Sequence, residues 1–369
     1  MGRAVVNTPE YDQRWRRTHV NILFVTHLPA GSRGGDADRV NGLMAGLRAG
    51  GHVVELRRLP IRKPIHARRW RPWWYVEPDA RWLSETATLA DASDLVVASL
   101  LPGATAVARA LVERRVSAPF VYDAHNDEAR LAAQTMRAAS GRRVGQMEDV
   151  VFATADTVWV AGERDAEELG RRYPKASLAN IPNGVDRDLP DLTDVAPVPG
   201  AAFTYGTWSY RPNADGLARL AATSFGGSGE MRVFGTIGEA QSRTLTKSAQ
   251  TAHANLRWTF RGFEKDWHAL AGSGATGVIP VWSGAGTKLR AVQLAAMGAP
   301  TIPTSEALSG LPEGFHELMP PVDDPAKLLA RALEGAAASA EARRELRRWV
   351  LDELSWDRLA EVAVAAALH

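Results

Sequence analysis

Short runs of β-branched and apolar residues alternate with helix-like segments along most of this chain, and the whole alternation occurs twice. The first series has a helix near 36–50 and strand-like runs at 20–26, 53–56, 94–100, 120–124, 156–161 and 177–182. The second series has a helix over 286–298 and runs at 201–206, 231–235, 256–260, 276–281 and 300–304. This alternation is typical of parallel sheets covered by helices on both faces. The sequence therefore predicts an α/β protein with two Rossmann-like domains.

A stretch rich in Pro and Asp separates the two series. We expect an N-terminal domain over 1–186, a linker over 187–200 and a C-terminal domain over 201–354. Ala-rich segments at 323–354 and 355–368 are each predicted to be helical. Two such domains imply a cleft between them, where α/β proteins usually bind their ligands.

Composition excludes several classes of protein. The 44 basic and 42 acidic residues give a net charge of only +2, so charge makes no case for nucleic acid. No apolar run approaches the roughly 18 to 20 residues that span a bilayer, and the first residues lack an apolar signal core. We therefore expect a cytoplasmic protein. The absence of cysteine excludes disulfides and thiol nucleophiles, and the nine histidines show no metal-ligand spacing.

The segment 282–300 (WSGAGTKLRAVQLAAMGAP) predicts a glycine-rich loop that opens a helix. Gly284 and Gly286 lie in the loop, and Lys288 and Arg290 lie at the start of the helix. Free backbone N–H groups, the positive helix end and two cations together favour a phosphate or diphosphate ligand. Taken alone, the same glycines could simply allow a tight turn between a buried strand and a helix.

Several motifs in one order resemble the two-domain GT-B glycosyltransferases, in particular the retaining glycosyltransferase family 4. They run from about residue 20 to about residue 365. The matching segments are 27–35 (HLPAGSRGG), 50–56, 122–130 (YDAHNDEAR), 148–169, 181–186 (IPNGVD), 205–217 (YGTWSYRPNADGL), 260–263 (FRGF), 281–302 and 309–311. The resemblance implies that a nucleotide-diphosphate sugar is the co-substrate, that no other cofactor is needed, and that the C-terminal helix at 355–369 returns to the first domain.

The resemblance also assigns the donor site. Lys288 is the first candidate for stabilising the leaving phosphate, where charge develops as the glycosidic bond breaks. Gly34 and Gly35 would approach the phosphates from the first domain. The remaining donor-binding candidates are Arg211, Gly262, Phe263, Ser283, Gly284, Gly286, Thr287, Leu289, Arg290 and Gln293. For Phe263, ordinary core packing is an equally good interpretation.

This chain departs from the family pattern at two carboxylates and two cations. Gln293 stands where the family has a glutamate that bonds the nucleotide ribose, and the earlier family glutamate falls at Ala285. The usual basic pair falls near Thr207 and Pro212, although Arg211 could supply a cation from next door. These departures leave two outcomes open: contacts built differently, or catalysis lost.

His125 follows the strand-like run 120–124, where functional residues of parallel sheets concentrate. The resemblance places a histidine here beside the transferred sugar, and a structural histidine is the alternative. Asp123, Asp127 and Glu128 crowd the same loop; they could do acid–base work, but an acidic cluster before a helix is commonly a cap. The resemblance implies that the leaving phosphate takes the acceptor proton, and no sequence suggests a catalytic metal.

The stretch from Arg57 to Trp82 combines basic and aromatic residues, and its cations from Arg57 to Arg71 have no acidic residue among them. It falls where the fold commonly builds its acceptor pocket, and we expect it to form an acceptor wall. A membrane contact, a nucleic-acid contact and a solvated loop are the alternatives. The acceptor-binding candidates are Arg68, Arg69, Arg71, Trp73 and Trp74.

We therefore expect a metal-independent, retaining glycosyltransferase with a small-molecule, glycan or lipid-linked acceptor, no nucleic-acid partner and a possible peripheral membrane contact. A pseudo-glycosyltransferase that only binds a donor or a partner is the alternative, as is a same-fold sugar-nucleotide epimerase. The sequence identifies neither the base nor the sugar of the donor.

Overall fold

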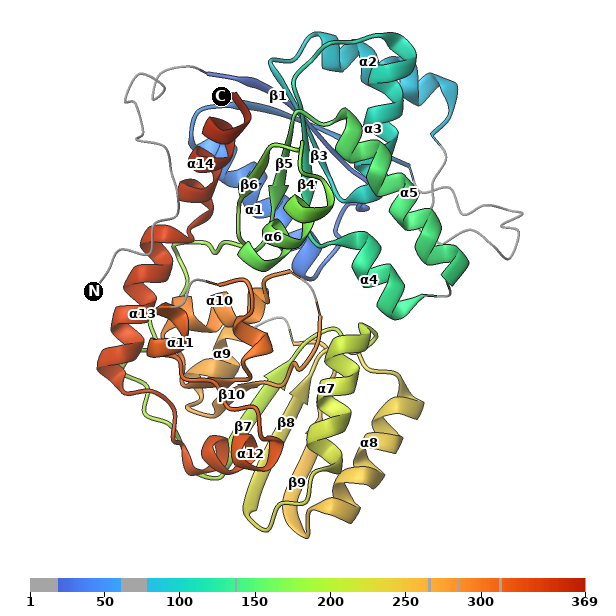
Figure 1. Ribbon diagram of the computed structural model, residues 1–369. Coiled ribbons are helices and arrows are strands. Elements are labelled where there is room, and N and C mark those ends of the chain that lie inside the picture. Colours follow the sequence, from blue (N-terminus) through green and yellow to red (C-terminus); the bar gives the residue numbers. More distant parts are fainter. Residues whose placement is uncertain are drawn as a thin grey trace. The chain divides into compact units, whose positions relative to one another are not determined.

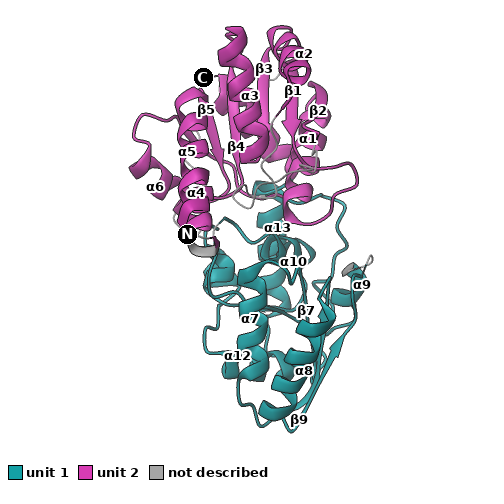
Figure 2. Ribbon diagram, turned by 90° about the vertical axis from the view of Figure 1, so that its right-hand side faces the viewer, with its two compact units in different colours: residues 1–4, 185–355 teal, residues 5–184, 356–369 magenta. Residues whose placement is uncertain are grey.

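The computed structural model describes residues 19–60, 78–136, 138–264, 267–284, 286–311 and 314–368. The chain divides into two compact units, shown in separate colours in Figure 2. The N-terminal unit contains the described residues up to Gly184 and those from Trp356 onward. The C-terminal unit spans Val185–Ser355.

The N-terminal unit is built on a six-stranded parallel sheet with the order β2-β1-β3-β4-β5-β6. Its inner strands β3, β4 and β5 are buried at every residue, because helices cover both faces. The strands are β1 (Asn21–Thr26), β2 (Val53–Arg58), β3 (Leu95–Ser99), β4 (Phe120–Ala124), β5 (Thr157–Val160) and β6 (Leu178–Asn180).

Seven helices belong to the described part of this unit. The side chains of Asp79 and Asp127 cap two of them by accepting backbone N–H groups of Trp82 and Arg130. The helices are α1 (Gly35–Ala49), α2 (Ala80–Asp91), α3 (Leu101–Arg114), α4 (Glu128–Thr135), α5 (Ala138–Thr154), α6 (Glu163–Arg172) and α14 (Trp356–Leu368).

The last helix, α14, packs on α1 (Figure 1) because two glycines of α1 leave room for it. A Cβ added at Gly42 would lie 2.1 Å from the Trp356 ring, and one at Gly46 would lie 2.3 Å from the Trp356 carbonyl oxygen. Gly184 gives the same ring space from another segment. Small residues at these positions therefore fix where the end of the chain docks.

The C-terminal unit has a five-stranded parallel sheet with the order β11-β10-β7-β8-β9. Helices α7 and α8 pack against each other, and α12 contacts four of the five strands. The strands are β7 (Ala201–Tyr205), β8 (Ser228–Phe234), β9 (Asn255–Phe260), β10 (Thr276–Ile279) and β11 (Thr301–Pro303). The helices are α7 (Arg211–Ala222), α8 (Glu239–Ala252), α9 (Trp267–Gly272), α10 (Leu289–Met297), the 3₁₀ turn η2 (Glu306–Leu308), α11 (Gly314–Leu318), α12 (Pro325–Glu334) and α13 (Ala340–Glu353).

The predicted α/β architecture with two parallel sheets is confirmed, and all eleven predicted strands are present. The stretch 323–354 is helical as predicted, and it is divided into two helices, α12 and α13. Gly335 ends α12 with a left-handed φ of 73°, and the Ser339 hydroxyl caps α13 by accepting from the Ala342 N–H.

The segment at 187–200 packs along the C-terminal unit. The N–H groups of Leu192, Val198 and Gly200 donate to carbonyl oxygens of that unit at 2.7, 2.8 and 2.7 Å. Arg343 of α13 adds hydrogen bonds to two further carbonyls of the segment, at Leu192 and Val195. The segment is therefore held by backbone contacts despite its irregular sequence.

Candidate functional site

The carboxyl edge of the C-terminal sheet brings together the loops that follow β7, β8 and β9. The Gly206 N–H donates to the Phe234 carbonyl at 3.2 Å, and the Gly235 N–H donates to the Gly262 carbonyl at 2.6 Å. Gly235 has a φ of 116°, and a Cβ added there would lie 1.9 Å from the Gly206 carbonyl oxygen. Only glycine permits this close approach.

Arg290, on the first turn of α10, points into this edge. Its guanidinium donates to the carbonyl oxygen of Tyr205 and, at 2.8 Å, to Oδ1 of Asn213. It also lies 5.9 Å from the centre of the Trp208 ring. Burial lowers the pKa of Arg290 to about 10, although the nearby Tyr205 opposes that shift.

No carboxylate among the described residues forms an ion pair with Arg290. Removing a cation from water without a counter-ion costs several kcal/mol, so buried cations are normally paired. Arg290 is only partly buried, which reduces this cost but does not remove it. A ligand that brings negative charge to this edge would complete the site.

Lys288, the N-cap residue of α10, is held differently. Its Nζ donates to the Gly286 carbonyl at 2.7 Å and lies 3.6 Å from Oε1 of Glu306, so its charge already has a partner. From the sequence we ranked Lys288 ahead of Arg290 as a phosphate contact. In the structure, however, Arg290 is the cation that has no carboxylate partner among the described residues.

The predicted glycine-rich loop is present immediately before α10. Gly284 and Gly286 have φ values of 143° and 66°, which favour glycine. Ser283 is exposed, Thr287 is buried, and Leu289 begins the helix. At the other end of α10, Arg343 and Arg347 donate to the carbonyls of Gly298 and Ala296. Cations therefore complement the negative end of this helix and leave its positive end to the loop.

Gln293 lies one turn further along α10, beside β7. Its Oε1 accepts a hydrogen bond from the Tyr205 hydroxyl at 3.1 Å. Tyr205 thus contacts both helix residues, since its carbonyl accepts from Arg290 and its hydroxyl donates to Gln293. The structure brings Lys288, Arg290 and Gln293 onto one short helix beside one strand end.

The other donor candidates lie at the surface of the same unit. Phe263 is 54% exposed, so core packing is the wrong interpretation of this residue. Gly262 has a φ of 68°, and a Cβ added there would meet nothing within 4 Å. Arg211 is 66% exposed and lies 3.5 Å from Asp215 on its own helix, so it contributes no buried charge to the edge.

A paired charge network lies at the carboxyl edge of the N-terminal sheet. The Arg39 guanidinium donates to Oδ1 of Asp123 at 2.9 and 2.7 Å, and both side chains are essentially fully buried. Burial alone would raise the pKa of Asp123, but Arg39 and His125 hold it well below its usual range. Ser99 donates to the other carboxylate oxygen at 2.8 Å. Sequence patterns did not identify Arg39 and Ser99, because their partner Asp123 is distant along the chain.

Both ring nitrogens of His125 are occupied within this network. Its Nε2 lies 2.7 Å from the Ser99 hydroxyl and 3.1 Å from Asp123, and its Nδ1 lies 3.0 Å from Asp36. Burial alone would lower the pKa of His125, but Asp123 and Asp36 raise it to about 9. The predicted site histidine is therefore a buried imidazolium whose hydrogen bonds are already made.

A second histidine at the same edge, His27, has a neutral ring where His125 has a charged one. His27 directly follows β1, and its Nδ1 is buried with no hydrogen-bond partner among the described residues. Burial lowers the pKa of His27 to about 4, with Asp36 opposing and His125 reinforcing the shift. Its place directly after a strand-like run was the signal that could have identified it from sequence.

Gly34 and Gly35 begin α1 at this edge. Gly34 is the N-cap residue with a φ of 102°, and no side chain caps the helix. A Cβ added at Gly35 would meet nothing within 4 Å. The first backbone N–H groups of such a helix have no partner within the helix, so they are available to an anion.

The acidic residues after His125 have structural partners. Asp127 caps α4 and pairs with Arg172, while Glu148 accepts the Glu128 N–H at 2.9 Å and lies 3.0 Å from Arg172. Burial raises the pKa of Glu128 and of Glu148 to about 7. These contacts favour the cap interpretation over a pair of hydrolytic carboxylates.

The predicted acceptor residues Arg68, Arg69, Arg71, Trp73 and Trp74 lie outside the described residues, as does Ala285. The described ends of the Arg57–Trp82 stretch pack on each other. Arg57 donates to Thr86 at 2.7 Å and lies 5.2 Å from the centre of the Trp82 ring. Arg57 and Trp82 therefore fasten β2 to α2.

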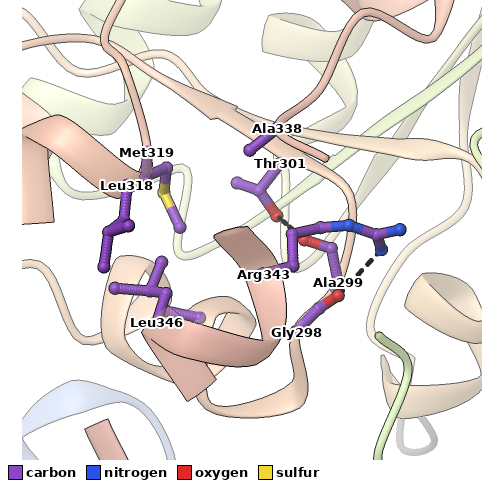
Figure 3. A pocket seen from close by; sticks show the side chains of 9 residues that line it. Gly298, Ala299, Thr301, Leu318, Met319, Ala338, Arg343 and Leu346 are labelled. Atoms are coloured by element: carbon purple, nitrogen blue, oxygen red, sulfur yellow. Dashed lines mark hydrogen bonds between the residues drawn. The ribbon is translucent and has the colours of Figure 1, made fainter. Parts of the chain in front are cut away.

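Neither of two hollows in the described part of the C-terminal unit is lined by Lys288, Arg290 or Gln293. Figure 3 shows a small pocket of about 10 Å³ between α10, α11 and α13, beside Arg343 and Thr301. That space holds one water at most. An open groove of about 390 Å³ lies between α7 and α8. Most of its lining side chains are small or apolar, and Asp215 and Gln241 are polar exceptions.

The fold is that of the GT-B glycosyltransferases, with two Rossmann-like domains. Sucrose-phosphate synthase from Thermosynechococcus elongatus is similar over 94% of this chain and 98% of its own, at 17% identity and a TM-score of 0.65. HepE from Anabaena, in complex with UDP and glucose, is similar over 95% and 99%, at 14% identity and a TM-score of 0.66. WaaG, a glycosyltransferase involved in lipopolysaccharide biosynthesis, is similar over 94% and 99%, at 14% identity and a TM-score of 0.64.

At these identities the likeness establishes the fold. No protein-family profile matches the chain, and no curated protein matches its sequence. Among the described helices, none combines the length and the apolar character that crossing a membrane requires.

Proposed function

We propose that this protein is a glycosyltransferase that takes its sugar from a nucleotide-diphosphate donor. The observation that carries the proposal is Arg290, a partly buried cation with no anionic partner among the described residues, at the carboxyl edge of the C-terminal sheet. A diphosphate supplies the missing charge, and Lys288 lies two residues away on the same helix. The fold supports the proposal, since HepE shares it and is seen in complex with UDP-glucose.

The two cations fit different moments of the reaction. Arg290 is fixed by Tyr205 and Asn213, so it suits a ground-state phosphate contact. Lys288 has a long, flexible side chain whose ammonium group pairs with Glu306. This group can move toward the phosphate that gains charge as the sugar leaves. We propose that transfer proceeds with retention and without a metal, with the departing phosphate accepting the proton of the acceptor hydroxyl.

The acceptor is proposed to bind the N-terminal unit, with the Arg57–Trp82 stretch as one wall. A small molecule, a glycan and a lipid-linked sugar remain the candidate acceptors, and a peripheral membrane contact through the same stretch is part of the proposal. We propose a cytoplasmic location.

Calorimetric titration with UDP, GDP, ADP and CDP tests the donor site. One of these should bind, and Arg290→Met should weaken that binding at least about tenfold, because a charge-assisted contact contributes about 1.5 to 3 kcal/mol. Arg257→Met is the matched control, since Arg257 is an exposed arginine of β9 paired with Glu230. Equal affinities in Arg290→Met and the native protein would remove Arg290 from the site.

A donor-binding protein without transferase activity is the second candidate. Gln293 favours it, because this residue offers a neutral amide where the resembling family has a carboxylate. Its hallmark would be tight nucleotide binding with no release of nucleoside diphosphate from any nucleotide sugar when acceptors are added. Release that depends on an acceptor would exclude it.

A further inference from the structure

One hydrogen bond restricts what the Gln293 side chain can offer a ligand. The Tyr205 hydroxyl donates to Oε1 of Gln293 at 3.1 Å, and the Tyr205 ring stacks with Phe203 at a centroid distance of 6.3 Å. A glutamine amide has one acceptor oxygen and two N–H donors. The oxygen has two lone pairs, and the Tyr205 hydroxyl occupies one of them. The Nε2 amide, from which no described residue accepts a hydrogen bond, offers a ligand two neutral donors.

The position of Gln293 relative to Arg290 indicates which part of a nucleotide it would contact. The two residues are three apart on α10, so their side chains are neighbours on one helix face. Both also contact Tyr205. In a nucleoside diphosphate the pentose is bonded directly to the diphosphate. A diphosphate bound at Arg290 therefore brings the pentose within reach of Gln293.

We infer that Tyr205 and Gln293 make this site tolerant of a 2′-deoxyribose, so that its donors include 2′-deoxyribonucleoside diphosphate sugars. The inference rests on the proposed nucleotide-sugar function. A carboxylate at position 293 would accept hydrogen bonds from two ribose hydroxyls, and loss of one hydroxyl would leave a charged oxygen unpaired. Loss of the same hydroxyl from the Gln293 amide leaves only a neutral N–H, which costs less.

The test compares affinities for ribose and deoxyribose forms of the same base. Dissociation constants of the full chain are measured by calorimetry for UDP, GDP, ADP and CDP and for their 2′-deoxy counterparts. For the base that binds, the native protein should show a ribose preference below about fivefold. Gln293→Glu should raise that preference to more than about tenfold, because a charged acceptor is then left unpaired by the deoxy form.

Two further variants isolate the cause. Tyr205→Phe leaves both lone pairs of Gln293 Oε1 available to a ribose hydroxyl, so the ribose preference should rise by about two- to fivefold. Gln250→Glu makes the same charge change at an exposed position of α8 and should leave the preference unaltered. Thermal melts of each variant establish that it is folded.

A ribose preference above about tenfold in the native protein would overturn the inference. So would an unchanged preference in Gln293→Glu, and in either case the proposed donor site stands because a nucleotide binds. Failure of all eight nucleotides to bind the native protein would overturn the proposed function, and the inference with it.

Discussion

The carboxyl edges of the two sheets handle charge in opposite ways. In the N-terminal unit the charges pair with one another: Arg39 with Asp123, and His125 with both Asp123 and Asp36. In the C-terminal unit, Arg290 donates only to a carbonyl and an amide oxygen. A closed network holds a shape, whereas an edge with an unmatched cation is prepared for an anion. Two parallel sheets of different strand order thus carry a paired edge in one unit and an edge with an unmatched cation in the other.

Among the variants considered, breaking the Arg39–Asp123–His125 network should lower the free energy of unfolding the most. Asp123→Ala leaves the buried Arg39 guanidinium without its counter-ion, which should cost about 3 to 5 kcal/mol of unfolding free energy. Urea denaturation measures it. The double variant Arg39→Met, Asp123→Ala should recover part of the loss, since no unpaired charge remains. A loss below about 1 kcal/mol in the single variant would mean that the pair is not closed in solution.

At the open edge, Lys288→Ala should lower kcat more than it weakens donor binding. The lysine charge is most valuable as the phosphate leaves, and losing one such contact typically costs about 2 to 4 kcal/mol of transition-state stabilisation. Lys247→Ala, at an exposed position of α8, serves as the control. A near-native kcat in Lys288→Ala would leave Arg290 as the only phosphate cation of the pair.

The closed network should also give stability a pH dependence. The pKa of His125 rises from 6.5 to about 9 on folding, so its contribution is fully present below pH 6.5 and is lost as the pH rises to about 9. The full loss is at most about 3 to 4 kcal/mol. Unfolding free energies measured at pH 6 and pH 9 should differ by less in His125→Gln than in the native protein. An equal difference in both proteins would place the titrating group elsewhere.

The smallest effect is a spectroscopic one that distinguishes two histidines at one edge. Burial lowers the pKa of His27 to about 4, whereas its carboxylate partners raise the pKa of His125 to about 9. Between pH 5 and 8, nitrogen NMR shifts should therefore report a neutral ring for His27 and a charged ring for His125. A reversed order, or two rings that titrate together near 6.5, would show that Asp36 is shared between them rather than bonded to His125.

The strands could be predicted because each is a local signal. A β-branched run bounded by Gly, Pro or Asp indicates a strand without any information about its tertiary contacts. The glycine-rich loop before α10 is equally a local signal. The break between α12 and α13 was missed because Ala-rich sequence has helical propensity on both sides of Gly335. A residue with left-handed φ ended the helix there.

The partners within each candidate site were beyond the reach of sequence patterns. Arg290 meets Tyr205 across 85 residues of chain and Asn213 across 77, and His125 meets Asp36 across 89. Sequence reasoning placed Arg290 at the start of a helix and His125 at a strand end but could not tell which charge had a partner. It therefore ranked Lys288 above Arg290 and treated His125 as available, although the geometry favours the reverse in both cases.

The docking of α14 against Gly42, Gly46 and Gly184 has a consequence for biosynthesis. Proteins generally fold domain by domain from the N-terminus as they are synthesised. Here the face of α1 that holds Gly42 and Gly46 stays uncovered until Trp356 and the rest of α14 have been synthesised. The whole C-terminal unit is translated before that point. A nascent chain stalled within that unit would therefore still expose the glycine face of α1.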